Sequence, residues 1–113
     1  MPELREDCLF CTLVRDGSHV HAADGFVAIN DINPQAPVHV LVLPEHHIDT
    51  FREVGEFDAD EAKRMLDFVA ETAAKVGLTD YRLVVNVGPG GAQTVYHLHW
   101  HILGGRDMNH RIV

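Results

Sequence analysis

The segment His97–Leu103, with the sequence HLHWHIL, constrains the fold more than any other part of the chain. Histidine alternates with large apolar residues along it. Successive side chains of a β-strand point to opposite faces, so this alternation predicts a strand over 97–103 with all three imidazoles on one face. The apolar side chains would then pack into a core on the other face. A solvated strand face that carries histidine by chance is the alternative interpretation.

The three histidines of this segment lie too far apart to bind one metal ion together. At about 3.3 Å per residue, His97 and His101 are separated by roughly 13 Å, whereas a Zn–N bond measures about 2 Å. Neighbouring histidines, about 6.6 Å apart, could share a metal ion or a phosphate-sized group. We therefore expect the triplet to be divided between separate tasks.

Length and charge limit the class of protein. A chain of 113 residues is enough for one compact domain, which we expect to span 1–113. The formal net charge of −8 excludes the broad cationic surface of a protein that binds duplex nucleic acid. No apolar run approaches the roughly 20 residues that span a bilayer, so no membrane association is expected. The acidic N-terminus does not resemble a secretory signal, and we expect a cytoplasmic location.

The only two cysteines, Cys8 and Cys11, form a Cys-x-x-Cys motif. In a reducing compartment this spacing is typical of metal ligands or of a redox pair. A redox pair usually follows a strand at the start of a helix, and no strand is predicted before Cys8. A zinc site would need two further ligands, which histidines could supply. Two buried thiols without a ligand are the alternative.

Hydrophobic patterns predict five strands and two helices. The expected strands are Val20–Ala23, Phe26–Asn30, Val38–Leu43, Tyr81–Val87 and His97–Leu103. Asp24-Gly25 is a hairpin turn signal, and Pro44 is expected to end the third strand. A short helix is expected from Cys8 to about Arg15. The sum is an α+β domain on an antiparallel sheet.

The main helix is expected to begin after Asp58 and to end at Gly77. Asp58 is the predicted N-cap, with Glu61 in the reciprocal capping position. One apolar face at spacings of three and four is formed by Ala62, Met65, Leu66, Val69, Ala73 and Val76. We interpret this face as core packing.

His99, at the centre of the triplet, is the candidate nucleophile. A neutral imidazole nitrogen can attack phosphorus, and the other ring nitrogen then needs an acceptor, which a backbone carbonyl could provide. His101, on the same face, could donate to a phosphate oxygen. The glycine-rich loop Gly88–Gly91, followed by Ala92-Gln93-Thr94, offers backbone N–H groups, an amide and a hydroxyl that suit an anion.

These residues resemble a known family. The span from Cys8 to Arg106 is similar to the histidine triad (HIT) proteins, in particular the histidine triad nucleotide-binding (Hint) branch. The resemblance is carried by four segments, which are HLHWHIL followed by Gly-Gly-Arg106, DINPQAP from Asp31 to Pro37, VLP from Val42 to Pro44 followed by His47-Ile48, and GAQTVYH from Gly91 to His97.

The resemblance implies a HIT-like fold and a homodimer whose seam is the main helix and the strand at 81–87, so that one sheet extends across both subunits. It implies a hydrolase that binds purine nucleoside monophosphates and cleaves nucleoside phosphoramidates, such as adenylated amines, through a nucleotidyl-histidine intermediate. No organic cofactor is implied. Cleavage of dinucleoside polyphosphates and a nucleotide-binding regulatory module remain as alternatives.

The resemblance also assigns roles to individual positions. His99 matches the nucleophile, His101 a histidine that contacts phosphate, and Thr94 a hydroxyl that contacts the phosphate or the leaving group. Asp31 matches the acceptor of the ribose hydroxyls; a turn residue before Asn33-Pro34 is its alternative. The full set matched to nucleotide binding is Ile29, Asn30, Asp31, Ile32, Asn86, Gln93, Thr94, Val95, His99 and His101.

Some relatives hold a structural zinc ion, and the matching positions here are Cys8, Cys11, His47 and His97. Two thiolates and two imidazoles suit a closed tetrahedral zinc site. A hydrogen-bonded His47–His97 pair without metal is the alternative. We expect His46 to face solvent and interpret the remaining histidines as incidental; these are His19, His21, His39 and His110.

Two departures from the family pattern concern substrate choice. Ala92 replaces a common glycine and, because alanine restricts positive φ, could reshape the loop. Thr94 replaces a common serine and keeps the hydroxyl. The tail Asp107–Val113 differs from that of eukaryotic members, in which the tail reaches the partner subunit.

Overall fold

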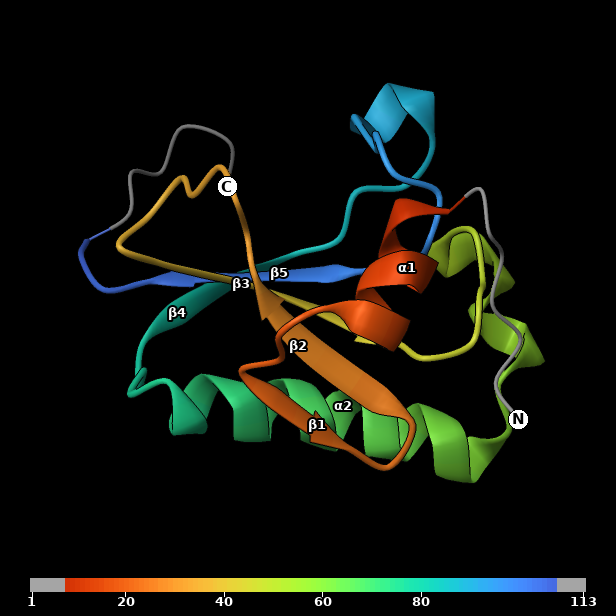
Figure 1. Ribbon diagram of the computed structural model, residues 1–113, viewed down its shortest axis with the longest axis horizontal. Coiled ribbons are helices and arrows are strands. Elements are labelled where there is room, and N and C mark those ends of the chain that lie inside the picture. Colours follow the sequence, from red (N-terminus) through yellow and green to blue (C-terminus); the bar gives the residue numbers. More distant parts are fainter. Residues whose placement is uncertain (1–7, 108–113) are drawn as a thin grey trace.

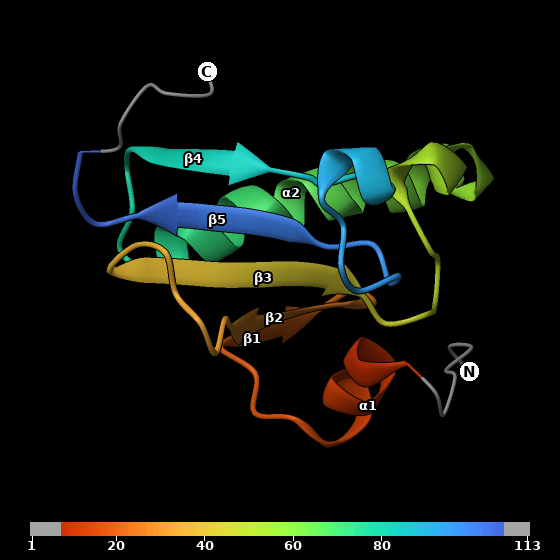
Figure 2. The same cartoon turned by 90° about the horizontal axis from the view of Figure 1, so that it is seen from above.

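A computed structural model describes residues 8–107, so the tail from 108 onward, including His110, lies outside the described residues. Its centre is one antiparallel sheet with the strand order β1-β2-β3-β5-β4 (Figures 1 and 2). The strands are β1 (His21–Ala23), β2 (Phe26–Asn30), β3 (Val38–Pro44), β4 (Tyr81–Val84) and β5 (Trp100–Gly104). The predicted α+β class with a five-stranded antiparallel sheet is confirmed.

Helices cover both faces of the sheet. The short helix α1 (Leu9–Asp16) lies on one face, and the long helix α2 (Ala59–Lys75) lies on the other (Figure 1). Two short 3-10 helices were not predicted, η1 (Phe51–Glu56) and η2 (Pro89–Gly91). Within residues 8–107, neither helix combines the length and the apolarity needed to cross a bilayer.

Period-two alternation along the strands supplies two apolar cores. On the α2 side, Val40, Val42 and Ile102 pack with Met65 and Phe68 of the helix. The alternate residues of β2 and β3 point to the opposite, α1 side of the sheet. There a second cluster is formed by Val27, Ile29, Leu41 and Leu43 of the sheet with Cys8, Phe10, Cys11 and Val14. The sheet is therefore buried on both faces, and any functional side chain on the α1 side lies close to α1.

The last strand begins at Trp100 and not at His97. The backbone N–H of Leu98 donates to the carbonyl of Ile48 at 2.6 Å, so this part of the chain is held by the loop after β3. β4 ends at Val84 and not at Val87, because Val84 opposite His101 is the last pair of the β4–β5 ladder. The predicted alternation nevertheless continues before the strand, since Leu98 and Ile102 both enter the α2-side core.

The start of α2 agrees with the sequence prediction only in part. Asp58 Oδ1 accepts the Glu61 N–H at 2.7 Å, which confirms the N-cap. The Glu61 carboxylate lies 3.4 Å from Nδ1 of the half-buried His46, so His46 does not simply face solvent. A complete capping box is found instead at Thr50 and Glu53, before η1.

The apolar face of α2 also differs in one position. Leu66 is 53% exposed, whereas Phe68 is buried in the core. Successive helical residues differ by about 100° in direction, and the burial of Met65, Phe68 and Val69 places Leu66 at the edge of the contact with the sheet.

Candidate active site and metal centre

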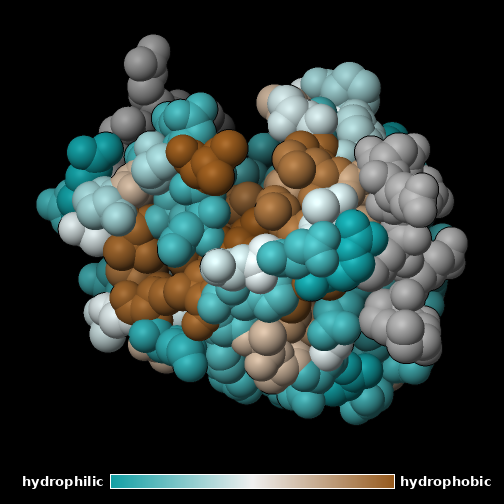
Figure 3. Space-filling model, in the orientation of Figure 1, coloured by the Kyte–Doolittle hydropathy of each residue, from teal (hydrophilic) through white to brown (hydrophobic). Residues whose placement is uncertain are grey.

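A cavity of about 330 Å³ lies between α1 and the sheet, a volume in the range of small-molecule sites. Its floor is formed by β2, β3 and β5, and its walls come from α1 and from the loops after β2 and β4. The lining residues are Leu9, Phe10, Leu13, Ile29, Asn30, Asp31, Ile32, Leu41, Asn86, Thr94, Val95, His99 and His101. The face of the molecule drawn in Figure 3 shows a hollow in which apolar surface lies between hydrophilic rims.

One ring nitrogen of His99 is fixed by the backbone. Nδ1 lies 2.8 Å from the carbonyl oxygen of His97, and because a carbonyl only accepts, Nδ1 carries the proton and donates. Nε2 therefore keeps its lone pair. Burial lowers the pKa of His99 from its usual value, which favours this neutral form. The Phe10 ring packs against the imidazole in a T-shaped arrangement at a centroid distance of 4.9 Å.

A hydrogen-bond chain fixes the opposite tautomer in His101. The Gln35 N–H donates to His39 Nδ1 at 3.0 Å, so a neutral His39 carries its proton on Nε2. His39 Nε2 then donates to His101 Nδ1 at 2.9 Å, and the His101 proton is left on Nε2. This Nε2 is buried and has no hydrogen-bond partner among the described residues. His101 thus keeps one N–H without a partner among the described residues, and its side chain lines the cavity together with His99.

The interpretation of His39 as incidental is wrong. His39 is buried and is the donor that sets the His101 tautomer. Leu41 is opposite His101 in the β3–β5 register, and His39 lies two residues from Leu41 on the same face, which makes it a diagonal neighbour. Period-two alternation in Val38–Leu43 places His39 on the face of Leu41, but the link to His101 requires the strand register.

Asp31 follows β2 at the rim of the cavity. Oδ1 accepts the Asn33 N–H at 2.8 Å, which is the turn contact considered from the sequence, and Oδ2 lies 3.4 Å from His39 Nε2. A carboxylate has about four acceptor positions, so lone pairs remain for ligand hydroxyls.

Asp31 also lies in the same group of close metal-ligating atoms as His39 and His101. The 2.9 Å His39–His101 contact is shorter than the roughly 3.3 Å that separates two nitrogens around a tetrahedral zinc ion, which favours a hydrogen bond.

Side-chain hydrogen bonds of Gln93 hold the loop that follows η2 in place. Its amide oxygen accepts the Gly88 N–H, and its amide nitrogen donates to the carbonyls of Asp49 and Val95. Gln93 is buried and is absent from the cavity lining, so it contacts the predicted nucleotide-binding residue Val95 without lining the cavity itself. The other nine predicted residues all line the cavity.

Alanine restricts positive φ, but Ala92 nevertheless adopts a positive φ of +65°.

The cysteines and two histidines form a second, compact cluster at the start of α1. Ligand atoms of Cys8, Cys11, His47 and His97 all lie within 4.8 Å of one another. His97 Nδ1 is 3.5 Å from both sulfurs, and His47 Nδ1 is 3.3 Å from the Cys11 sulfur. Both imidazoles turn Nδ1 toward the thiols, which is not the arrangement of a hydrogen-bonded histidine pair. The cluster could bind a metal ion such as zinc.

Distances and neighbours fit a tetrahedral zinc ion. Bond lengths of about 2.3 Å to sulfur and 2.0–2.1 Å to nitrogen give an S–N separation of about 3.5 Å around tetrahedral zinc. His97 Nε2 donates to the Pro44 carbonyl at 2.8 Å, and His47 Nε2 lies 2.5 Å from Asp49 Oδ1. Such outer partners orient metal-bound histidines. Burial lowers the pKa of His97 to about 4, so the imidazole is neutral at pH 7, as a metal ligand must be.

The triplet is thus divided as the spacing predicted. His97 faces the thiols, whereas His99 and His101 line the cavity. Phe10, between the two cysteines, lies against both groups, with ring centroids 6.2 Å from His97 and 4.9 Å from His99. The metal cluster and the cavity share α1 as a common wall.

Comparisons with known proteins agree with this α+β fold. The HIT domain family model matches residues 13–108. An uncharacterized HIT-like protein of Synechococcus elongatus is 41% identical over 109 residues, which are 93% of this chain and 96% of that protein. A purine nucleoside phosphoramidase of Escherichia coli K12 is 34% identical over 110 residues, which are 93% and 92% of the two chains.

A solved structure shows the same fold. The HIT family hydrolase from Clostridium thermocellum has a TM-score of 0.87 and 37% sequence identity, over 96% of this chain and 99% of that chain. The protein described here belongs to the HIT family and resembles its hydrolases.

Proposed function

We propose that this chain is a Hint-like nucleoside phosphoramidate hydrolase, which releases a purine nucleoside monophosphate and an amine through a nucleotidyl–His99 intermediate. The observation that carries the proposal is the pair of fixed tautomers, which leaves a lone pair on His99 Nε2 and an N–H without a partner on His101 Nε2, in two rings whose centroids are 5.0 Å apart. The relative named purine nucleoside phosphoramidase adds support for this reaction class.

The cavity suits the three parts of a nucleotide. Ile29, Ile32, Leu13 and Phe10 offer apolar surface for a planar base, and Ile32 is almost fully exposed until a ligand covers it. Asp31 at the rim accepts the ribose hydroxyls. The phosphate lies near His99 and His101, with Asn86, Thr94 and the backbone of Val95 around it. In this scheme Gln93 acts indirectly, by holding the loop that carries Thr94.

In the first step, the His99 Nε2 lone pair attacks the α-phosphorus and the P–N bond to the amine breaks. The amine nitrogen keeps the bonding electron pair and takes a proton from water through the exposed Thr94 hydroxyl. The His101 N–H donates to a phosphate oxygen as negative charge develops there. The His97 carbonyl, which accepts from Nδ1, stabilises the positive charge that forms on the His99 ring.

In the second step, water attacks the phosphorus and the P–Nε2 bond breaks. His99 recovers its lone pair, and the proton of the water passes to solvent. The sum is phosphoramidate plus water giving nucleoside monophosphate plus amine.

The metal group would have a structural role. Cys8, Cys11, His47 and His97 would hold zinc, which joins the start of α1 to the segment that precedes His99. We further propose a cytoplasmic homodimer of single-domain subunits, with β4 and α2 at the seam.

Hydrolysis of a fluorogenic adenosine phosphoramidate by the wild type and by His99→Ala tests the reaction. We expect amine release by the wild type alone, with AMP binding largely retained in the variant. Turnover by His99→Ala would exclude His99 as the nucleophile. Turnover of diadenosine tetraphosphate in place of the phosphoramidate would move the assignment to another branch of the family.

A further inference from the structure

We propose that a second cavity, next to the first, receives the amine leaving group, and that Tyr96 contacts the body of that amine. The inference rests on the proposed function and deepens it, because it concerns which amines are released. This cavity has a volume of about 390 Å³ and is lined by Cys8, Leu9, His47, Asp49, Thr94, Val95 and Tyr96.

The two cavities adjoin along a shared wall. Leu9, Thr94 and Val95 line both of them, whereas His99 and His101 line only the first. A leaving group in a displacement at phosphorus departs roughly opposite the attacking atom. Because Thr94 lines both cavities and His99 lines only the first, a group that leaves away from Nε2 can enter the second cavity. Thr94 carries a hydroxyl and is common to both cavities, where the amine nitrogen needs its proton.

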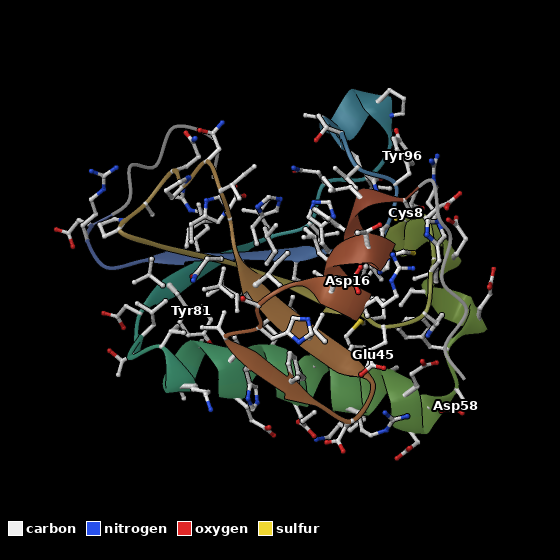
Figure 4. All side chains as sticks on the ribbon, in the orientation of Figure 1. Cys8, Asp16, Glu45, Asp58, Tyr81 and Tyr96 are labelled. Atoms are coloured by element: carbon white, nitrogen blue, oxygen red, sulfur yellow. The ribbon has the colours of Figure 1, made fainter. Side chains whose placement is uncertain are left out.

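The walls of the second cavity fit an amine with an apolar or aromatic body. Leu9 is 54% exposed and Tyr96 is 37% exposed, so within residues 8–107 both present uncovered surface to a ligand. Figure 4 shows Tyr96 above Cys8 near the start of α1, and both residues line this cavity. An aromatic ring stacks on a tyrosine ring with an energy beyond that of simple area burial.

Negative charge in the lining of the second cavity favours binding of the released amine. The released amine becomes an ammonium ion at neutral pH, and the Asp49 carboxylate lines this cavity. Asp49 also contacts His47 Nε2, which ties this wall to the metal group. A nucleotide phosphate would be repelled by the same carboxylate, so the two cavities differ in the part of the substrate that they accept.

Two phosphoramidates that differ only in the amine test the proposal. Adenosine 5′-phosphoramidate releases ammonia and cannot fill the second cavity, whereas the N-(2-phenylethyl) derivative can. In Tyr96→Ala we expect kcat/KM for the phenylethyl substrate to fall about 3- to 10-fold, the usual size of an aromatic pair contact, while kcat/KM for the ammonia substrate stays within about 2-fold. Tyr96→Phe retains the ring and should retain both values.

Tyr81→Ala is the matched control, since Tyr81 is also 37% exposed but lies on β4. It should change neither substrate selectively, and zinc content should be equal in all variants. Equal losses for both substrates in Tyr96→Ala, or no loss for either, would overturn the subsite. If the wild type turns over neither substrate, the hydrolase assignment itself is wrong, and the proposed subsite is wrong as well.

Discussion

Ala92 has a left-handed backbone at φ +65°, which costs an L-residue with a Cβ about 1–2 kcal/mol. Ala92→Gly should therefore raise the free energy of unfolding by up to about 1 kcal/mol, after subtraction of the 0.4–1 kcal/mol that glycine adds to the unfolded-state entropy. Urea denaturation measures the change. The family's common glycine at this position has the same physical explanation.

Gly77 provides the reverse test. It follows α2 at φ +84°, and a Cβ there would meet no atom within 4 Å. Gly77→Ala should therefore destabilise the protein through the backbone alone, by about 1 kcal/mol. If both substitutions shift stability in the same direction, left-handed strain is not what governs these two positions.

His101 gives the protein a stability that decreases in acid. Burial lowers its pKa to about 4 from 6.5, so the unfolded chain binds more protons between these pH values. The free energy of unfolding should fall as pH drops from about 6.5 toward 4. One such group contributes at most about 1.4 kcal/mol per pH unit, less where solvent screens it.

Urea titrations at pH 7.5 and 5.0 isolate this contribution when wild type and His101→Gln are compared. Glutamine keeps an N–H donor and an acceptor but does not titrate in this range. The loss of stability between the two pH values should be smaller in the variant. An equal or larger loss in His101→Gln would assign the acid sensitivity to other groups, such as the metal ligands.

At the scale of single elements, α1 is the wall shared by the Cys8–Cys11–His47–His97 cluster and the cavity that is proposed to bind nucleotide. Cys8 and Cys11 hold one side of it, while Leu9, Phe10 and Leu13 line the cavity. If the cluster holds zinc as proposed, its removal by a chelator should loosen α1 and weaken AMP binding by about 5-fold or more, a typical coupling between sites. Linkage requires that AMP tighten zinc binding by the same factor, which competition with a zinc indicator measures.

Phe10→Leu is the variant that separates this coupling from general unfolding. It keeps an apolar residue between the cysteines but removes the ring that contacts His99 and His97. Zinc content should be retained, and the mutual effect of zinc and AMP should shrink. Unchanged AMP affinity in the zinc-free wild type would show that the two sites are independent.

Sequence patterns predicted most of the elements because each pattern is local. The alternation in Val38–Leu43, the N-cap Asp58 and the turn Asp24-Gly25 each carry their own signal. What the sequence did not predict depends on partners far along the chain. The end of β4 follows from its register with β5, and the role of His39 follows from its diagonal contact with His101. The hydrogen bonds that Gln93 makes to Gly88 and Asp49 likewise depend on how the loops meet.

At the scale of the whole molecule, β4 leaves one edge of the sheet without a neighbour among the described strands. Leu83 is opposite Ile102 and Tyr81 is opposite Gly104, so both point to the α2 side, and they are 44% and 37% exposed. Leu66 of α2 adds a further exposed apolar side chain. Unprotected edges with apolar residues favour pairing with another chain. This surface is the basis for the proposed homodimer, in which two β4 strands join the sheets.

Leu83→Glu should convert the dimer to a monomer, because burial of a carboxylate without a partner costs several kcal/mol. Sedimentation velocity at micromolar concentration measures the mass of the wild type and of the variant. Leu9→Glu is the control, since Leu9 is similarly exposed but lies on α1, on the opposite face of the sheet. It should leave the mass unchanged. A monomeric wild type, or a Leu83→Glu variant that keeps the mass of two chains, would show that β4 is not the seam, and circular dichroism would establish that the variant is folded.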